Sequence, residues 1–137
     1  MSWVEIVQNG MVSTGFINTG AVLSTQGVQF AGTVGFKVKK DDFDTIVRSF
    51  HNTADLFRNG LTVCDKKYVV ISANPRIIHA KSGPSGVICM RARKCVLVAL
   101  YFPPVSAPQA IGTMETLADD INEGLYKTEE TPVVVPD

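Results

Sequence analysis

Residues 66–102, KKYVVISANPRIIHAKSGPSGVICMRARKCVLVALYF, decide the fold, because they predict four β-strands with no helix between them. The apolar runs are rich in Val and Ile and are separated by turn signals, such as Asn74-Pro75 and the glycine-containing loop at 81–86. Connections this short cannot hold a crossover helix, so we expect these strands to pair antiparallel. The run LTVC at 61–64 precedes them and predicts a fifth strand.

The segment before these strands contains both strand and helix signals. Two strand-like runs, FINTGAVLS at 16–24 and GVQFAGTVGF at 27–36, are separated by a short turn. Asp41 suits the N-cap of a following helix. The apolar face predicted for this helix comprises Phe43, Ile46, Val47 and Phe50. A shorter helix, TADLFRNG at 53–60, ends at a glycine that suits the C′ position.

The first residues predict a short amphipathic helix over 3–11. Ser2 and Glu5 have the spacing of a capping box, in which two side chains satisfy the free amides of a helix start. The stripe predicted to be buried comprises Val4, Val7 and Met11. Trp3, the only tryptophan, and Ile6 fall at the edge of that stripe.

The last helix carries the clearest signal in the chain. Ser106 and Gln109 form a second capping box, and the helix is predicted to end near Gly124. Its apolar stripe comprises Ile111, Met114, Leu117, Ala118, Ile121 and Leu125. The order of elements is helix, two strands, helices, five strands and helix, which predicts an α+β fold.

Positive and negative charges are separated along the chain, although its formal net charge is zero. Seven of the thirteen basic residues lie between Lys66 and Lys94, with no Asp or Glu among them, whereas acidic residues dominate from Glu115 onward. This separation creates a field that can steer an acidic partner to one side of the molecule. Alternatively, the basic residues belong to a solvated sheet face and discourage pairing between sheet edges. Charge alone leaves both interpretations open.

The cysteines and histidines do not predict a metal site. The three cysteines, Cys64, Cys89 and Cys95, form no CxxC pair, and there are only two histidines. Each cysteine lies in an apolar run, where a reduced thiol behaves as a small hydrophobic group. A Cys89–Cys95 pairing across a hairpin stays open, although the cytosol disfavours structural disulfides.

Catalytic chemistry is not indicated either, since the chain has no Walker, GxSxG, HExxH or GxGxxG motif. The aspartates at 41, 42 and 44 fit a solvated helix start, and the adjacent Asp119 and Asp120 point in different directions on a helix. We expect no catalytic residue, no cofactor and no nucleic-acid partner. No apolar run is long enough to span a membrane, and the N-terminal pattern is not that of a secretory signal, so we expect a cytoplasmic protein.

Several passages resemble the profilins, a family of small proteins that bind monomeric actin. They are the MSW opening, SFHNTADLFRNGLTV at 49–63, the strand–loop–strand block at 66–89, and YFPPVSAPQAIGTMETLADDI at 101–121. The resemblance covers Met1 to Tyr126 and implies one domain over 1–126, leaving 127–137 as a loosely held tail. It implies a central antiparallel sheet with the N- and C-terminal helices on one face and two smaller helices on the other.

The resemblance implies a groove for proline-rich segments in the polyproline II conformation, which is extended and rigid and packs against flat aromatic faces. Trp3, Phe30 and Tyr126 match aromatic positions of that groove. Ile6 and Asp120 stand where the family usually has aromatic residues. Ile6 cannot donate a hydroxyl hydrogen bond and Asp120 adds a charge, so we expect a weaker or differently selective site. Alternatively, Trp3 has a purely structural role and packs the terminal helices together. That role is compatible with binding a proline-rich segment.

The resemblance also implies an actin-binding surface on the strands of the second half and on the start of the last helix. The candidates by position are Lys67, Val70, Arg76, Lys81, Arg91, Gln109, Thr113 and Glu115. Ser72 stands where an arginine is common, so part of the usual ion pairing is missing. We expect Arg91 and Arg93 to share one side of a strand, because side chains alternate with a period of two. Phosphoinositide headgroups are further expected ligands of this basic surface.

The implied function is binding and not catalysis. The protein would hold monomeric actin, favour nucleotide exchange on it, and deliver it to filaments through proline-rich partners such as formins. The alternative is a small-molecule sensor domain of the PAS or GAF type, which also packs helices around an antiparallel sheet. A sensor needs an interior pocket with convergent polar groups, whereas the runs VVI and VLVAL indicate a filled core.

Overall fold

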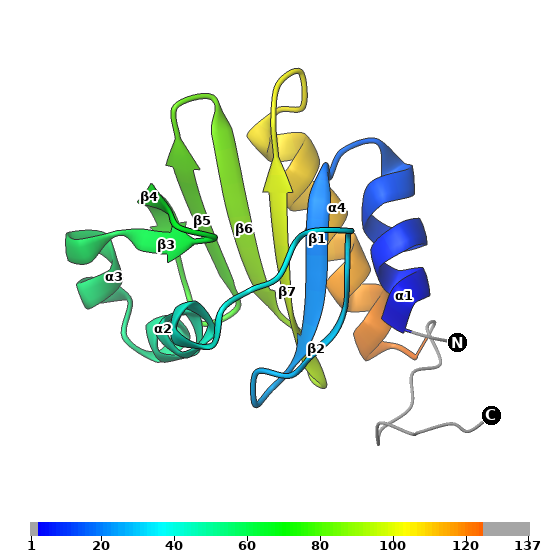
Figure 1. Ribbon diagram of the computed structural model, residues 1–137, viewed down its shortest axis with the longest axis horizontal. Coiled ribbons are helices and arrows are strands. Elements are labelled where there is room, and N and C mark those ends of the chain that lie inside the picture. Colours follow the sequence, from blue (N-terminus) through cyan, green and yellow to red (C-terminus); the bar gives the residue numbers. More distant parts are fainter. Residues whose placement is uncertain (1–2, 125–137) are drawn as a thin grey trace.

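One antiparallel sheet of seven strands separates two layers of helices in the computed structural model, which describes residues 3–124 (Figure 1). The helices are α1 (Trp3–Glu5), η1 (Ile6–Met11), η2 (Val12–Thr14), α2 (Lys40–His51), α3 (Thr53–Asn59) and α4 (Ala107–Asn122). The strands are β1 (Thr19–Ser24), β2 (Gln29–Gly32), β3 (Leu61–Val63), β4 (Lys66–Ala73), β5 (Ile77–Ser82), β6 (Ser85–Arg91) and β7 (Cys95–Tyr101). The strand order is β2-β1-β7-β6-β5-β4-β3. The predicted α+β class and antiparallel pairing are confirmed.

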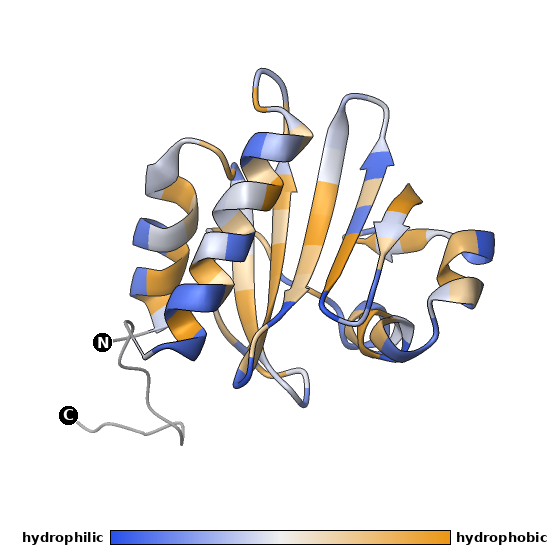
Figure 2. Ribbon diagram, turned by 180° about the vertical axis from the view of Figure 1, so that it is seen from behind, coloured by the Kyte–Doolittle hydropathy of each residue, from blue (hydrophilic) through white to orange (hydrophobic). Residues whose placement is uncertain are grey.

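The middle strands are buried on both sides, because helices cover both faces of the sheet. In β6, Val87 and Cys89 join the core under α2 and α3, whereas Ile88 and Met90 join the core under η1 and α4. This double burial explains why the sequence of β6 reads as a continuous apolar run. Figure 2 shows the second layer from outside, with α1 and α4 lying side by side.

The N-terminal helix is wound differently from the prediction. After one turn of α-helix it continues as a π-helix over Ile6–Met11, which has more residues per turn than an α-helix. The buried side therefore comprises Ile6, Val7, Gly10 and Met11. Val4, predicted to be buried, is 47% exposed, whereas Ile6 is 0% exposed. The predicted capping residue Ser2 lies outside the described residues.

The strand β2 is shorter than the predicted run at 27–36. The side-chain amide of Gln29 accepts a hydrogen bond from the Val38 amide and donates one to the Phe36 carbonyl, at 3.0 and 2.9 Å. These bonds satisfy the backbone of the segment that leaves the strand. The chain therefore turns away after Gly32 and crosses toward α2, where Phe36 and Val38 enter the core.

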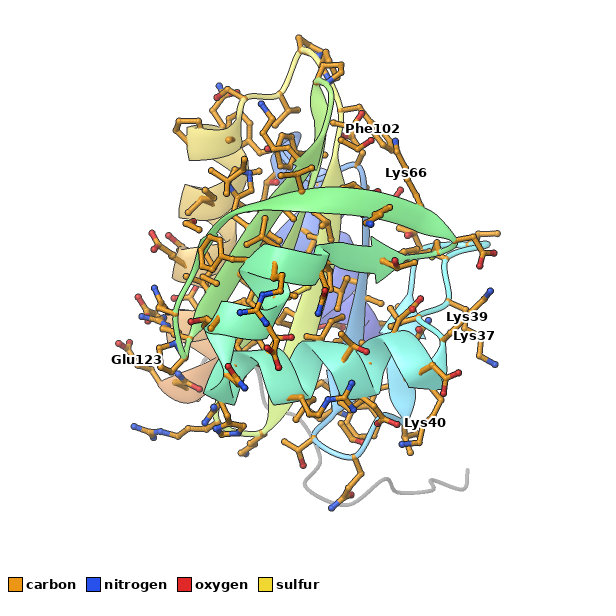
Figure 3. All side chains as sticks on the ribbon, turned by 90° about the vertical axis from the view of Figure 1, so that its left-hand side faces the viewer. Lys37, Lys39, Lys40, Lys66, Phe102 and Glu123 are labelled. Carbon is orange, nitrogen blue, oxygen red and sulfur yellow. The ribbon has the colours of Figure 1, made fainter. Side chains whose placement is uncertain are left out.

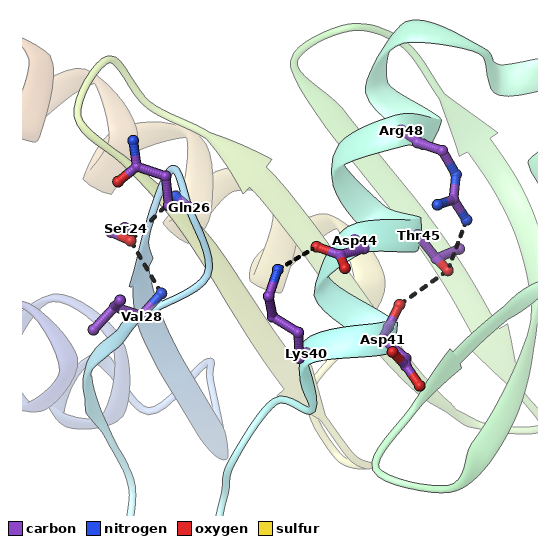
Figure 4. A network of polar contacts seen from close by, with 8 residues as sticks. All are labelled: Ser24, Gln26, Val28, Lys40, Asp41, Asp44, Thr45 and Arg48. Carbon is purple, nitrogen blue, oxygen red and sulfur yellow. Dashed lines mark hydrogen bonds and ion pairs between the residues drawn. The ribbon is translucent and has the colours of Figure 1, made fainter.

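Helix α2 begins at Lys40, and Lys39, not Asp41, is its N-cap. Asp41 lies in the first turn, where a carboxylate interacts favourably with the helix dipole. Figure 4 shows the local contacts of residues 41–44: Lys40 Nζ lies 2.9 Å from Asp44 Oδ1, and the Thr45 hydroxyl donates a hydrogen bond to the Asp41 carbonyl. The predicted apolar face is confirmed for three residues, Phe43, Ile46 and Phe50, which are buried.

Helix α4 begins as the sequence predicts. The Ser106 hydroxyl accepts from the Gln109 amide, and the Gln109 side chain accepts from the Ser106 amide, which completes the capping box. The buried face comprises Ala110, Met114, Leu117, Ala118 and Ile121. Ile111 is only partly buried, and Leu125 lies outside the described residues.

Two buried cysteines lie on opposite faces of the sheet. Cys89 packs under α2, whereas Cys95 packs under α4, so they cannot form the disulfide that the sequence left open. Burial raises the pKa of each thiol to about 12, which keeps both protonated and unreactive. Within residues 3–124, no helix is long and apolar enough to span a bilayer, and no group of His, Cys, Asp or Glu could hold a metal ion.

A glycine of β6 allows a tyrosine to lie flat across the sheet. A Cβ at Gly86 would come 2.3 Å from the ring of Tyr101, its register partner on β7. The Tyr101 hydroxyl shares a hydrogen bond of 2.7 Å with His79 Nε2 on β5, and both side chains are buried. Burial lowers the pKa of His79, and the nearby Lys81 ammonium lowers it further. His79 is therefore neutral at neutral pH.

We predict that Gly86→Ala lowers the free energy of unfolding by about 2 kcal/mol, because the new methyl group overlaps a ring that the His79 hydrogen bond holds in place. Urea denaturation measures this change. The matched control is Gly112→Ala, where nothing lies within 4 Å, and it should raise stability by roughly 0.5–1 kcal/mol through helix propensity. Equal effects of the two substitutions would contradict the close packing of Tyr101 on Gly86.

We predict that stability falls as the pH drops below about 6.5, because unfolded His79 then binds a proton that the folded protein, with its lower pKa, does not. The contribution of neutral His79 to the free energy of unfolding is complete above that pH and is lost as the pH falls towards the pKa of His79 in the folded protein. The urea concentration at the midpoint of unfolding, measured at pH values between about 5 and 8, tests this prediction, because histidine ordinarily titrates in that range. The variant His79→Gln should lose this part of the slope; an unchanged slope would assign the effect to another group.

Candidate functional site

Two aromatic rings form an exposed platform at the start of the N-terminal helix. Trp3 of α1 and Phe30 of β2 are stacked, with ring centroids 4.5 Å apart and planes inclined by 19°. Both side chains pack on the core under η1 and α4 and are only partly buried. We call this pair the aromatic platform. It presents flat apolar surface to solvent and has no titratable group, so it suits binding and not catalysis.

The platform exists because the two terminal helices share one face of the sheet. η1 packs against both β1 and α4, and α1 packs against β2. Figures 1 and 2 show the start of α1 beside the end of α4. The expected meeting of the terminal helices on one face is therefore confirmed. Trp3 consequently has the packing role that the sequence allowed, and part of its ring stays free.

The other residues predicted for the proline-rich site are placed differently. Ile6 is fully buried in the core and exposes no side-chain surface to a ligand. The π-helical winding turns the Ile6 side chain towards the sheet. Residue 6 therefore presents neither a hydroxyl group nor apolar surface to a ligand. Asp120 on α4 is partly exposed. Tyr126 lies outside the described residues.

A second candidate surface lies on β4 and β5, on the face that α4 also occupies. We define the β4–β5 surface as Lys67, Val69, Ile71, Ser72 and Lys81. Val69 and Ile71 are 69% and 53% exposed, which is unusual for large apolar side chains on a sheet. Val69 is the register partner of Lys81, so apolar and basic groups lie next to each other.

Val70, which the sequence analysis gives as an actin-binding candidate, does not lie on the β4–β5 surface. Val70 is 7% exposed and packs in the core under α2 and α3, next to Tyr68. Its neighbours therefore point outward, and a β-bulge between Val70 and Ser72 leaves Ile71 without a register partner on β5. The signal that could have found this is the aromatic Tyr68, which marks the inward side of the alternation.

Arg76 ties the β4–β5 turn to α4. Its guanidinium lies 2.5 Å from Asp119 Oδ1, and both side chains are about half exposed. The turn itself is fixed by the Asn74 side chain, which accepts hydrogen bonds from the amides of Arg76 and Ile77. Arg76 thus reaches the flank of α4 that carries Asp119, and Glu115 lies one turn before Asp119 on the same flank.

The remaining candidates on α4 lie on a different flank. Gln109, Thr113 and Asp120 are separated by four and seven residues, a spacing that places them on one line along the helix. The Thr113 hydroxyl donates to the Gln109 carbonyl at 2.9 Å. The eight predicted actin-binding residues are therefore not all brought together: Gln109 and Thr113 share their flank with Asp120 and not with Glu115.

The basic segment at 66–94 does not form a single face. Arg91 lies on the opposite side of the sheet from Lys81, where its guanidinium stands 5.8 Å from the ring centroid of Phe50. Arg93 follows the end of β6; its amide donates to the Asn122 side chain, and its guanidinium donates to the Asn122 carbonyl. Because β6 ends at Arg91, the alternation of strand side chains does not decide where Arg93 lies; Arg91 and Arg93 both line one hollow together with Asn122.

Further basic residues lie at the far edge of the molecule. Figure 3 shows Lys37, Lys39 and Lys66 together on one side, with Glu123 on the other. Lys39 Nζ lies 2.5 Å from Asp65 Oδ1, and this hydrogen bond and charge raise the pKa of Lys39. Part of the basic charge outside the β4–β5 surface is thus paired locally.

Comparisons with known proteins identify the family. The family model described as profilin matches residues 1–126. The profilin of Drosophila melanogaster is 31% identical over 119 residues, which cover 87% of this chain and 94% of that protein. The structure of Acanthamoeba castellanii profilin IB has a TM-score of 0.86 and 30% identity, covering 91% of this chain and 100% of that chain.

Mouse profilin IIa, solved in complex with a double repeat from the FH1 domain of mDia1, shares the fold with a TM-score of 0.75 and 21% identity. It covers 92% of this chain and 100% of its own length. The fold described above and the sequence matches agree. The chain belongs to the profilin family.

Proposed function

We propose that the protein binds monomeric actin through the β4–β5 surface and the adjoining flank of α4, and proline-rich segments through the aromatic platform. The observation that carries this proposal is the exposure of Val69 and Ile71 between Lys67 and Lys81. Apolar anchors within a basic rim suit a protein partner with an acidic surface. Membership of the profilin family supports the same partner. The activity is regulation of filament assembly in the cytoplasm, by binding and not by catalysis.

Actin regulation then follows from differential affinity. If the β4–β5 surface binds an opened form of actin more tightly than a closed form, nucleotide exchange on actin is accelerated by a population shift. Phosphoinositide headgroups would compete at Lys67 and Lys81, and that competition would weaken with salt. A sensor role is not favoured, because buried side chains pack both faces of the sheet.

Binding of proline-rich segments is proposed for the aromatic platform. The stacked rings of Trp3 and Phe30 offer a flat apolar surface, which is what polyproline II segments pack against. The mouse relative that was solved with a formin repeat supports this ligand class. The site is weaker than usual in the family, because Ile6 is buried and Asp120 contributes charge where an aromatic ring would add stacking area.

We predict that Lys81→Glu and Ile71→Asp each weaken actin binding by about tenfold, since one reverses a rim charge and the other removes an apolar anchor. Measuring the affinity for monomeric actin by calorimetry tests this. The matched control is Arg48→Glu, an exposed basic residue on α2, which covers the opposite face of the sheet, and it should change the affinity less than about twofold. Equal losses for Lys81→Glu and Arg48→Glu would show a diffuse charge effect and contradict the assigned surface.

We predict that Trp3→Ala lowers the affinity for decaproline by at least roughly tenfold, because half of the stacked pair is lost. Calorimetry is required, since this variant has no tryptophan fluorescence. Phe57→Ala, which removes a half-exposed ring on α3, is the control and should leave the affinity unchanged.

The same titration tests the proposed weakening by Asp120. Asp120→Asn keeps the shape of the side chain and removes its charge, so it should strengthen decaproline binding by roughly two- to fivefold. An unchanged affinity would mean that the ligand does not pass this flank of α4.

A further inference from the structure

Three arginines from separate parts of the sheet line one hollow at the end of α4. Arg76 lies in the turn before β5, Arg91 is the last residue of β6, and Arg93 lies in the turn before β7. The hollow has a volume of about 340 Å³, and its other lining residues are Asn74, Pro75, Ala92 and Asn122. We call it the arginine hollow. Because Asn122 is the last residue of α4, the chain leaves the helix beside this hollow.

Two of the three guanidinium groups form no ion pair with any of residues 3–124. Arg76 pairs with Asp119 of α4. Arg91 instead faces an aromatic ring of α2, and the Arg93 guanidinium donates a hydrogen bond to the Asn122 carbonyl. Both of these arginines are exposed. The arginine hollow therefore carries two positive charges that no described carboxylate neutralises at ion-pair distance.

An acidic segment follows α4 in the chain. Residues 125–137, LYKTEETPVVVPD, lie outside the described residues, and they contain Glu129, Glu130 and Asp137 against the single Lys127. The match to the profilin family model ends at residue 126. The two adjacent glutamates thus lie beyond the part of the chain that the family model covers, and the family fold does not account for them.

The segment is long enough to bring these glutamates to the arginine hollow. Five residue steps separate Gly124 from Glu129, and an extended chain spans about 17 Å over five residues. The guanidinium of Arg93 lies 3.4 Å from the carbonyl oxygen of Asn122, only two residues before Gly124. A connection this short also gives the carboxylates an effective concentration in the millimolar range, so even weak ion pairs form within the molecule.

We propose that Glu129 and Glu130 pair with Arg91 and Arg93 in the arginine hollow, so that the protein's own acidic segment occupies this site. The basis is charge complementarity, since carboxylates and guanidinium groups form charge-assisted hydrogen bonds. The contact holds part of the segment that the sequence analysis expects to be loosely held. It also screens the arginines from other anions, and salt weakens it. This inference does not depend on the binding of actin or of proline-rich segments.

The test uses the full chain and the double variant Glu129→Gln/Glu130→Gln, which keeps side-chain size and removes both charges. The NMR signals of the Nε–H groups of Arg91 and Arg93 should move in this variant. Sodium chloride at roughly 0.5 M should move the signals of the original protein in the same direction, because salt screens exposed ion pairs. Arginine signals that stay in place in the double variant would overturn the contact.

The matched control is Asp41→Asn/Asp55→Asn, which removes two exposed carboxylates from α2 and α3. It should leave the Nε–H signals of Arg91 and Arg93 in place. Equal movement of these signals in the control and in the double variant would show a general effect of net charge and would contradict a contact in the arginine hollow.

Pyrophosphate provides a second readout, because it competes for the same guanidinium groups. The Glu129→Gln/Glu130→Gln variant should bind pyrophosphate about threefold more tightly than the original protein, as followed by the signals of Arg91 and Arg93. Equal affinities would contradict the proposal. Suppose that the arginine signals are the same in both proteins but move on adding monomeric actin or vesicles of equal parts phosphatidylcholine and phosphatidylserine. The hollow would then belong to that partner and not to the acidic segment.

Discussion

The structure depends on the burial of the central strands on both faces. β6 and β7 place alternate side chains in two separate cores, so each face needs a helical layer to cover it. Because η1 and α4 cover the same face, the start of α1 comes to lie beside the end of α4, and Trp3 reaches Phe30. The aromatic platform is thus a consequence of how the sheet is covered.

The two-residue alternation of the strands separates the proposed ligand surfaces. On β4 it directs Val70 into one core and leaves Val69 and Ile71 in solvent on the opposite face. On β5 it sets Lys81 next to Val69, and the buried His79–Tyr101 pair lies on the same face. The platform lies at the opposite edge of the sheet, at β2, so the two proposed ligand surfaces do not overlap.

Elements that depend on local chemistry were predicted correctly from the sequence. Features that depend on tertiary packing were not. The capping box of Ser106 and Gln109 and the strands joined by tight turns were predicted correctly, because their signals are local. The π-helical winding that buries Ile6 is set by contact with the sheet and α4, which no local pattern reveals. Regular alternation from Tyr68 turns Val70 into the core, and Arg91 lies beside Phe50, so neither residue shares the face that Lys81 occupies.

The central claim is that the protein carries two separate binding surfaces on one sheet, one for proline-rich segments and one for actin. Hydrogen exchange of the backbone amides, measured for the free protein and with each ligand, tests this claim most directly. Decaproline should slow exchange in 3–13 and 29–34, and monomeric actin should slow it in 67–82 and at the start of α4. Protection of the same segments by both ligands would contradict the account.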